Sequence, residues 1–489
     1  MLFGKDQLVF DLPESGKKQT YIRPCDVEMP DFAKRFGACA RKEKVDFPNL
    51  AETTVIRHYT NASLRNYGVE NGMYPLGSCT MKYNPKINED MAALPGFAFT
   101  HPLQPISTVQ GNLELLYKLQ GNLSDLTGMD AWTFQPSAGA HGELTGVLAI
   151  RAYHEDRGDT KRRIMLIPDS AHGTNPASAA MAGFKVVELK SSESGLVDLE
   201  DLKSKLSDEV AGMMLTNPNT LGYFEKDAAE IARLVHDAGG LMYYDGANLN
   251  AIMMHVRPGD MGFDVVHLNV HKTLSTPHGG GGPGAGPVGV KSFLKDFLPK
   301  PTVAKKENGE YFLNYDMPKS VGKVRGYTGS FGIFVRTFAY IEALGAKGLY
   351  DASEGAVANA NYIKERLKDI LVLPYDTDVM HEAAMSGIKQ KERGCSTLHI
   401  CKRLMDYGLH APTMYFPNIV EESLMIEPTE TEDKASLDAF VEAIKKIDEE
   451  TKTNPEIVNE APHNTPICQP DEATAARYPV LKYGDVAKK

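Results

Sequence analysis

One lysine stands where it could do covalent chemistry, in the segment Asn269-Val270-His271-Lys272-Thr273. The segment follows a predicted strand and precedes Pro277-His278 and a run of glycines. Ligands of open α/β sheets bind at the carboxyl ends of strands, and a partly desolvated lysine there can form an imine with a carbonyl cofactor. The alternative is an exposed lysine in a flexible loop, where most lysines lie. A dinucleotide site is not predicted, because Pro283 interrupts the glycines and a strand-like segment at 288–290 follows in place of a helix.

An aspartate is expected at the end of another buried strand, in the segment Tyr243-Tyr244-Asp245-Gly246-Ala247-Asn248. A buried carboxylate is costly without a cationic partner, and a protonated pyridine nitrogen is such a partner. Asp245 could equally cap the turn that follows the strand.

Polar loops follow three further predicted strands. In Ser137-Ala138-Gly139-Ala140-His141-Gly142-Glu143, small residues would let backbone N–H groups point at an anion, and the dipole of the next helix would favour a phosphate. An ordinary serine N-cap is the alternative. The imidazole of His172 could stack on an aromatic cofactor or simply form hydrogen bonds within its loop. Asn217 could reach a phenolic oxygen or only form a turn.

The order of these residues is the stronger signal. A phosphate-type turn, a histidine, an asparagine, an aspartate and a lysine each follow a successive strand. One crevice at the carboxyl edge of a sheet would therefore collect all five.

Short apolar segments that alternate with helices predict the sheet that would position these loops. The alternation is typical of a mostly parallel sheet covered on both faces. The expected strands are 131–134, 164–167, 184–189, 211–215, 241–244, 265–268 and an edge-like strand at 288–290. A long helix at 334–367, strands at 371–373 and 424–427 and helices at 396–407 and 434–449 then predict a second, smaller α+β domain.

The chain of 489 residues is accordingly divided into four parts. We interpret residues 1–90 as an arm or irregular cover, 91–335 as the large cofactor-binding α/β domain, 336–450 as the small C-terminal α+β domain and 451–489 as a tail.

Composition narrows the classes of function. The chain has 53 basic and 64 acidic residues and a net charge of -11, which argues against binding to a nucleic-acid backbone. Its apolar runs are too short for a membrane-spanning helix, and residues 1–16 have neither an export signal nor a transit peptide. The six cysteines include no C-x-x-C pair. Neither a metal site nor a disulfide scaffold is therefore predicted, and a reducing cytoplasm fits.

The order of these loops along the chain resembles that of the fold type I family of pyridoxal 5'-phosphate (PLP) enzymes. Three segments are similar to those of one member family, the P-protein of the glycine cleavage system, over roughly residues 60–450. These segments are Ser137 to Glu143, Tyr74-Pro-Leu-Gly-Ser-Cys-Thr-Met-Lys-Tyr83, and His271-Lys272-Thr273 with Thr276-Pro277-His278-Gly-Gly-Gly-Gly-Pro-Gly. The resemblance implies an α/β fold with a mostly parallel large domain and a smaller C-terminal α+β domain.

Residue by residue, the resemblance implies that Lys272 binds PLP covalently, that Asp245 pairs with the pyridine nitrogen and that His172 stacks on the ring. Cys79 could line the site or be a buried structural thiol. The other cofactor-binding residues that it implies are Ser137, Ala138, Gly139 and Ala140 around the phosphate, Ala247 against the ring, and, by position alone, Asn217, His271 and Thr328.

The family decarboxylates glycine and passes the aminomethyl group to the lipoyl arm of the H-protein. It occurs as one long chain or as two subunits, and a chain of this length with the lysine motif resembles the β subunit. The resemblance thus implies three partners: glycine, an α subunit without the lysine in an α2β2 tetramer, and the lipoylated H-protein.

Two alternatives remain open. Another fold type I enzyme, such as an amino-acid decarboxylase or a cysteine desulfurase, would use PLP without a lipoyl partner. A non-catalytic structural subunit would keep the fold alone, although such a subunit should lack the lysine.

Overall fold

The computed structural model describes residues 7–12, 25–43, 45, 47–279, 284–375 and 377–486. The chain separates into two units, one formed by its two ends, up to Gly68 and from His463 onward, and one formed by Val69–Pro462. The four-part division expected from the sequence stays a prediction.

The terminal unit consists of short helices. Phe10 stacks on Tyr483 with ring centroids 4.9 Å apart, and the Tyr483 hydroxyl donates to Asp11 Oδ1 at 2.6 Å. Segments from the two ends of the chain are therefore packed together. The helices are η1 (Val9–Asp11), α1 (Phe32–Phe36), η2 (Gly37–Cys39), α2 (Glu52–Ser63), α16 (Glu472–Arg477) and α17 (Tyr483–Val486).

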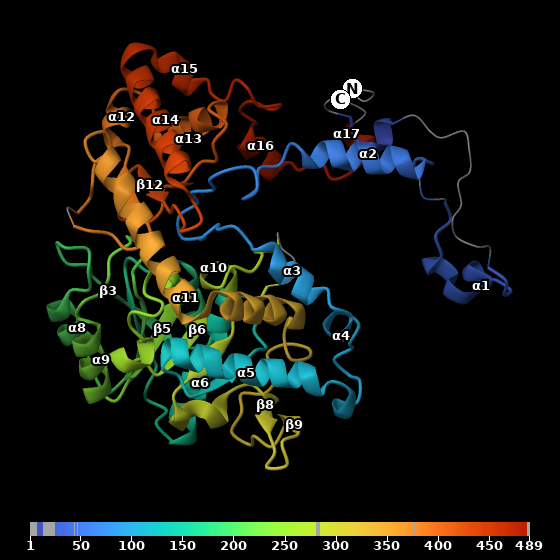
Figure 1. The fold of residues 1–489 in the computed structure, drawn as a ribbon, viewed down its shortest axis with the longest axis vertical. Coiled ribbons are helices and arrows are strands. Elements are labelled where there is room, and N and C mark those ends of the chain that lie inside the picture. Colours follow the sequence, from blue (N-terminus) through green and yellow to red (C-terminus); the bar gives the residue numbers. More distant parts are fainter. Residues whose placement is uncertain are drawn as a thin grey trace. The chain divides into compact units, whose positions relative to one another are not determined.

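A seven-stranded sheet lies at the centre of the larger unit (Figure 1). Its strand order is β1-β7-β6-β5-β4-β2-β3, in which β7 is antiparallel to both neighbours and every other pair is parallel. The strands are β1 (Ala131–Thr133), β2 (Ile164–Pro168), β3 (Lys185–Leu189), β4 (Val210–Thr216), β5 (Leu241–Gly246), β6 (Val265–Leu268) and β7 (Val288–Val290).

Two apolar cores cover the faces of this sheet. Met214 and Tyr243 belong to the core that contains residues of α6 and α7, whereas Met213 and Tyr244 belong to the core of α5 and α9. Neighbouring strand residues point to opposite faces, which explains why both β4 and β5 are apolar almost throughout. The helices around the sheet are α5 (Gln110–Thr127), α6 (Gly139–Asp156), α7 (Thr174–Met181), α8 (Leu199–Lys205) and α9 (Ala228–Asp237).

Short elements complete the connections of the sheet. The chain enters through α3 (Lys86–Ala92), α4 (Pro95–Ala98) and η3 (Ile106–Thr108), and a hairpin of β8 (Thr302–Lys305) and β9 (Tyr311–Asn314) follows β7. The remaining short helices are η4 (Leu249–Ala251), η5 (Pro258–Met261), α10 (Val270–Thr273) and η6 (Ser292–Phe297).

The long helix α11 (Phe331–Leu367) leads from the sheet to a second packed region of the same unit (Figure 1). Non-helical backbone at Gly345, with φ 60°, kinks this helix. A third core there surrounds an antiparallel sheet of order β10-β12-β11. Its elements are β10 (Ala383–Ser386), α12 (Ile388–Glu392), α13 (Thr397–Asp406), β11 (Thr413–Met414), β12 (Ser423–Ile426), α14 (Lys434–Thr453) and α15 (Pro455–Asn459).

The predicted fold class is confirmed, but some elements were predicted wrongly. Residues 288–290 form an interior strand, because Gly289 leaves room for the Trp132 ring, which would lie 2.7 Å from a Cβ at that position. Residues 371–373 contribute only a bridge between Val372 and Ser386. Helix α5 was not predicted at all. Within the described part of the chain, no helix is both long and apolar enough to cross a membrane.

Candidate active site

The loops that carry the predicted residues begin along one edge of the sheet. Strands β1, β2, β4, β5 and β6 all run in the same direction, since β1 and β6 are each antiparallel to β7. The electrostatic effects also connect three of the residues, because Lys272 and His172 both help to lower the pKa of Asp245. The structure therefore brings Lys272, Asp245 and His172 into one site.

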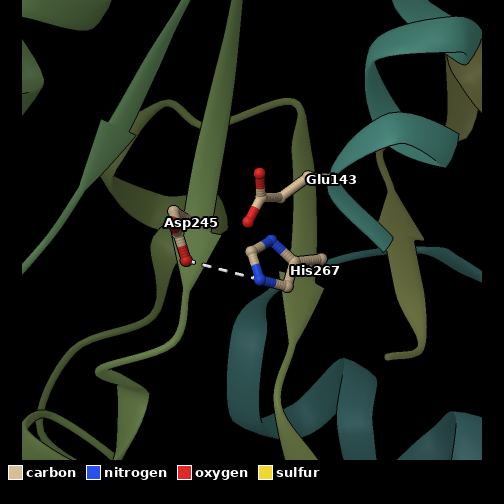
Figure 2. A group of neighbouring side chains, drawn as sticks. All are labelled: Glu143, Asp245 and His267. Carbon is tan, nitrogen blue, oxygen red and sulfur yellow. Dashed lines mark ion pairs between the residues drawn. The ribbon is translucent and has the colours of Figure 1, made fainter. Parts of the chain in front are cut away.

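Asp245 lies at the end of β5 beside His267 on β6, its register partner (Figure 2). Burial by itself would raise the pKa of Asp245, but His267 and the N–H of Ala247, which donates to Oδ1 at 3.0 Å, hold the pKa below its usual value. Burial lowers the pKa of His267, so its ring is neutral. The Tyr243 hydroxyl lies 2.7 Å from Nδ1 of that ring and Nε2 lies 3.3 Å from Asp245 Oδ1. With Tyr243 donating to Nδ1, the Nε2–H faces the carboxylate, which favours an anionic Asp245.

A second buried carboxylate, Glu143 of α6, lies beside this pair (Figure 2). Burial and the nearby Asp245 raise the pKa of Glu143 to about 7. The Thr174 hydroxyl donates to Glu143 Oε1 at 2.7 Å and lies 2.9 Å from His172 Nδ1. Glu143 therefore holds Thr174, whose backbone N–H donates to His172 Nδ1 at 3.2 Å, while the imidazole itself stays at the exposed surface of its loop.

Lys272 is 8% exposed, and its Nζ donates to the carbonyl oxygen of Ser78 at 2.6 Å. Ser78 belongs to the turn Gly77–Thr80 of the segment that resembles the P-protein motif. Ser78 and Thr80 have φ angles of 65° and 45°, a left-handed conformation that is strained for residues with a side chain. The lysine thus lies in a closed environment, held by backbone from a distant part of the chain.

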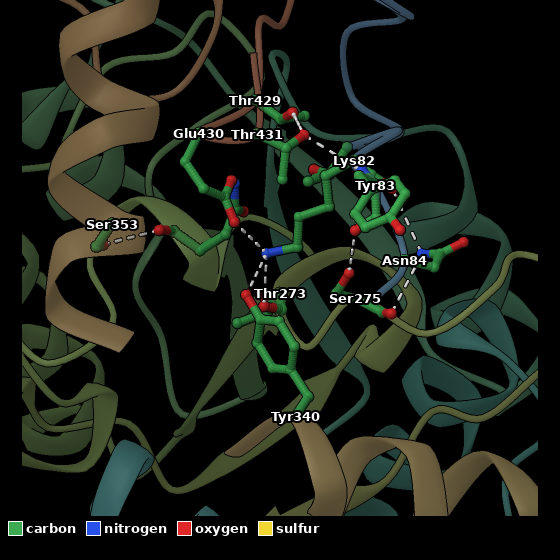
Figure 3. A network of polar contacts seen from close by, with 12 residues as sticks. Lys82, Tyr83, Asn84, Thr273, Ser275, Tyr340, Ser353, Thr429, Glu430 and Thr431 are labelled. Atoms are coloured by element: carbon green, nitrogen blue, oxygen red, sulfur yellow. Dashed lines mark hydrogen bonds and ion pairs between the residues drawn. The ribbon is translucent and has the colours of Figure 1, made fainter. Parts of the chain in front are cut away.

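Hydrogen bonds join Lys82 and Tyr83, which follow this turn, to residues next to Lys272 (Figure 3). Lys82 Nζ donates to the Thr273 carbonyl at 2.9 Å and to Glu430 at 2.7 Å, and the Ser275 hydroxyl donates to the Tyr83 carbonyl at 2.6 Å. These contacts hold the residues that directly follow Lys272 in place.

The start of α6 has the open backbone expected of an anion cradle. Ala138 is the N-cap and its helix has no side-chain cap, while Ala138 and Ala140 are exposed and Ser137 is half-buried. A Cβ on Gly139 would lie 2.1 Å from Asn269 Oδ1, and one on Gly286 would lie 2.1 Å from the Ala138 carbonyl. A side chain at Gly286 would meet backbone atoms and one at Gly139 would meet the buried Asn269 side chain, so both positions favour glycine. Residues 280–283 of the glycine run lie outside the described residues.

Two other predicted cofactor-binding residues, Asn217 and Thr328, make contacts of a different kind. Both polar atoms of the Asn217 side chain bond the backbone of Glu225, at 2.9 and 3.3 Å. Thr328 lines a separate pocket with His101 and Phe331. The roles assigned to these two residues stay predictions.

Three further residues lie next to the site: His271, Ala247 and Cys79. His271 packs edge-on against His278, and burial lowers the pKa of His271 to about 3. Ala247 is half-buried and anchors Asp245 through its N–H. Burial raises the pKa of the half-buried Cys79 thiol, and its part in the site stays open.

Sequence reasoning missed four residues close to Lys272 or Asp245. Glu143 stood in a quoted motif without a role, and His267 carried no local signal. Glu427 is the last residue of a predicted strand, a signal like the one that identified Asp245, and Glu382 follows a histidine just before β10. Glu382 and Glu427 accept hydrogen bonds from the Ser78–Thr80 turn.

Comparison with known proteins identifies the family. The family model described as "Glycine cleavage system P-protein" matches residues 37–310, and "Glycine dehydrogenase, C-terminal domain" matches residues 352–466. A protein of Caldanaerobacter subterraneus subsp. tengcongensis named "Probable glycine dehydrogenase (decarboxylating) subunit 2" is 59% identical, over 99% of this chain and 100% of its own. The chain belongs to the P-protein family of the glycine cleavage system.

Further relatives extend the match to other organisms. Proteins of the same name from Thermococcus onnurineus and Listeria monocytogenes are 55% and 57% identical over 98% and 97% of this chain, and over 96% and 95% of their own. These relatives and family models support the P-protein family and give no support to the alternative functions.

Solved structures share the fold. A crystal structure of "glycine decarboxylase (P-protein) of the glycine cleavage system, in inhibitor-bound form" has a TM-score of 0.71 at 21% identity, covering 88% of this chain and 100% of that one. A sphingosine-1-phosphate lyase from Burkholderia pseudomallei has a TM-score of 0.60 at 13% identity, over 87% of this chain and 96% of its own.

Proposed function

We propose that this P-protein chain is the PLP-binding half of a glycine decarboxylase and transfers the aminomethyl group of glycine to the lipoyl disulfide of an H-protein. The observation that carries the proposal is the combination of a buried lysine and a buried, anionic aspartate at neighbouring strand ends. Lys272 would bind the cofactor aldehyde and Asp245 would pair with the protonated ring nitrogen.

The described residues fit PLP at three points. The buried amine of Lys272 suits an aldehyde, the low pKa of Asp245 suits a cationic ring nitrogen, and the uncapped first turn of α6 suits a phosphate. Bound PLP would supply an electron sink for the electron pair that is left when glycine loses its carboxylate.

The side chains of the chain itself would orient and protect this reaction. His267 and the Ala247 N–H hold Asp245 as an anion. Glu143 and Thr174 orient His172, which would cover the exposed side of the ring. The Ser78 carbonyl would hold the Lys272 amine whenever it is not bound to the cofactor.

The overall reaction balances without a further reactant. The bond between the α-carbon and the carboxylate of glycine breaks, and carbon dioxide leaves. The α-carbon then bonds one sulfur of the lipoyl disulfide as the S–S bond breaks, and the other sulfur keeps that electron pair and takes up a proton as a thiol.

The proposal includes the partners that this reaction needs. We place beside this chain a second subunit without the lysine, in an α2β2 tetramer, and a lipoylated H-protein that brings the disulfide. A cytoplasmic location remains a prediction from the cysteine pattern.

Borohydride reduction of the PLP-loaded chain, followed by peptide mapping, tests the proposal. We expect the label on Lys272 and loss of the near-visible absorbance band in Lys272→Ala. We also expect little exchange of carbon dioxide with glycine until the second subunit and lipoylated H-protein are added. A label on another residue, or full turnover of a larger amino acid by this chain alone, would overturn the proposal.

A further inference from the structure

A cluster of buried ionisable side chains lies behind the Ser78–Thr80 turn. His381 and Glu382 directly precede β10, and Glu427 directly follows β12. Because Ala383 pairs with Ile426, these residues emerge at the same end of the antiparallel sheet. His381 Nε2 lies 3.6 Å from Glu382 Oε1 and 3.9 Å from Glu427 Oε1.

The two glutamates hold the turn whose carbonyl binds Lys272. The Ser78 N–H donates to Glu382 Oε2 at 2.6 Å, and the Thr80 N–H donates to Glu427 Oε2 at 2.9 Å. The Thr80 hydroxyl also donates to Glu427 Oε1. A strained turn persists only where its surroundings over-determine it, and these contacts supply that constraint.

The cluster has no cation of its own. Glu382 and Glu427 are 0% and 1% exposed, and within the described part of the chain neither carboxylate has a lysine or arginine at ion-pair distance. Neither ring nitrogen of His381 has a hydrogen-bond partner among the described residues. Burial of two unpaired carboxylates in contact with one histidine is very costly unless a proton or a nearby cation compensates them.

The titration behaviour agrees with this geometry. Burial lowers the pKa of His381 to about 3, so the ring is neutral. Burial raises the pKa of Glu427 to about 7, and burial together with Glu427 raises that of Glu382 well above its usual value. Among the described residues, Lys272, Glu430 and the Cys79 thiol act on the cluster from outside, and Glu430 is already paired with Lys82 at 2.7 Å.

We propose that Glu382 and Glu427, with His381 between them, are positioning residues that hold one proton between them and provide the counter-charge of the Lys272 amine. They act on Lys272 through the Ser78–Thr80 turn and through their shared negative charge. When the Lys272 amine carries its proton, the pair keeps one negative charge. This negative charge stabilises the protonated form of the Lys272 amine.

This inference deepens the proposed function, because it concerns the lysine on which that function rests. A bound divalent cation is the competing explanation of two carboxylates and a histidine. It is disfavoured because three of the four carboxylate oxygens already accept bonds from the turn and because Lys272 donates to the Ser78 carbonyl of the same turn.

The test measures the reactivity of Lys272 in the PLP-free full chain, so it does not depend on activity. Competitive acetylation with mass spectrometry gives the pH midpoint at which Lys272 becomes nucleophilic, in wild type, Glu382→Gln, Glu427→Gln and the double variant. Glutamine still accepts the N–H of the turn but cannot carry the charge. Groups that act with Lys272 and stay unchanged in all variants are Cys79, Glu143, His172, Asp245, His267, His271, His278 and His381.

We expect each single variant to lower the midpoint by a few tenths of a pH unit, since one carboxylate remains to carry the charge. The double variant should lower it by about one pH unit or more, beyond the sum of the two. Glu422→Gln is the matched control, because Glu422 is also buried and accepts a backbone N–H, from Thr397 at 2.8 Å, but does not act on Lys272. Its midpoint should equal that of wild type.

An unchanged midpoint in a folded double variant would overturn the inference. If the double variant does not fold, the single variants decide, since both must move the midpoint while Glu422→Gln does not. Stoichiometric binding of Zn²⁺ or Mn²⁺ to the wild-type chain that is lost in the variants would also overturn it, in favour of a metal site. A normal borohydride label on Lys272 with no midpoint shift would reject the carboxylate pair and leave the proposed function intact.

Discussion

Gly139→Ala tests whether the first turn of α6 binds the cofactor phosphate. Gly139 is the first residue of this helix, and a Cβ there would lie 2.1 Å from Oδ1 and 2.9 Å from Cγ of Asn269. Non-bonded heavy atoms in ordinary contact are about 3.5 Å apart. Either the turn or Asn269 must therefore move by more than about 1 Å. Asn269 is buried, so its side chain has little room to turn away and the first turn of α6 should give way.

The displacement should weaken cofactor binding more than folding. Overpacking of a well-packed site costs about 1–3 kcal/mol. Since about 1.4 kcal/mol is a factor of ten in affinity, the Kd of the PLP-free chain for PLP should rise about 10- to 100-fold. Titration of the stripped full chain with PLP, followed by the near-visible absorbance, measures this change. Thermal unfolding without PLP checks the fold.

Two controls isolate the steric cause. Gly111→Ala is the matched variant, because Gly111 is the second residue of α5 and a Cβ there has nothing within 4 Å. Its Kd should equal that of wild type. Asn269→Ala removes the atoms that the new methyl group would meet, so Gly139→Ala with Asn269→Ala should recover much of the lost affinity. A wild-type Kd in Gly139→Ala would refute the phosphate cradle, and no recovery in the double variant would refute the steric argument.

Three more variants test the rest of the site. Asp245→Asn should keep the absorbance band but lower kcat for glycine about 100-fold or more, because the ring nitrogen loses its anionic partner; the exposed Asp260→Asn serves as the control, and equal kinetics in both would contradict this role. Lys272→Ala should lose the borohydride label with an unchanged far-ultraviolet circular dichroism spectrum, whereas a retained label would assign the covalent site elsewhere. In Glu143, the pKa rises from 4.5 to about 7 on folding, so the folded chain holds a proton there that the unfolded chain releases. The stability that this proton adds is complete below about pH 4.5 and is lost as the pH rises through about 7. The melting temperature of Glu143→Gln should therefore fall less than that of wild type between about pH 5 and 7.5. An equal fall in both proteins would contradict the raised pKa of Glu143.

The sheet and its site-bearing loops could be predicted because their signals are local. A buried strand is a short apolar run, and the chemistry-bearing residue follows it within a few positions, as with Lys272 after β6 and Asp245 in β5. Parallel strands end on the same edge, so their order along the chain already indicates a shared crevice. The same local criteria failed at 288–290, where glycine and proline are typical of an edge although the Trp132 ring packs on Gly289 in the sheet interior.

The side-chain environment was predicted far less well. The signal that identified Asp245, a carboxylate at the end of a buried strand, is equally present at Glu427. Nothing local indicates that Glu427 belongs with Thr80, 347 residues away, or that Glu382 belongs with Ser78, 304 residues away. For Asn217 the local signal pointed to a cofactor contact. Its side chain instead bonds the backbone of Glu225 in its own loop.

Residue type, periodicity and spacing were thus enough to predict the main strands and to single out the lysine and the aspartate, whereas the family was predicted from the resemblance of three segments to the P-protein. The strands and the loops after them depend on the alternation of side chains along a strand and on backbone conformations that glycine adopts easily. Residues that are close together in the sequence determine both. Folding determined which groups surround Lys272 and what charge they carry. The free energy of a buried charge depends on every polar atom within a few ångströms, and here those atoms come from segments that are hundreds of residues apart.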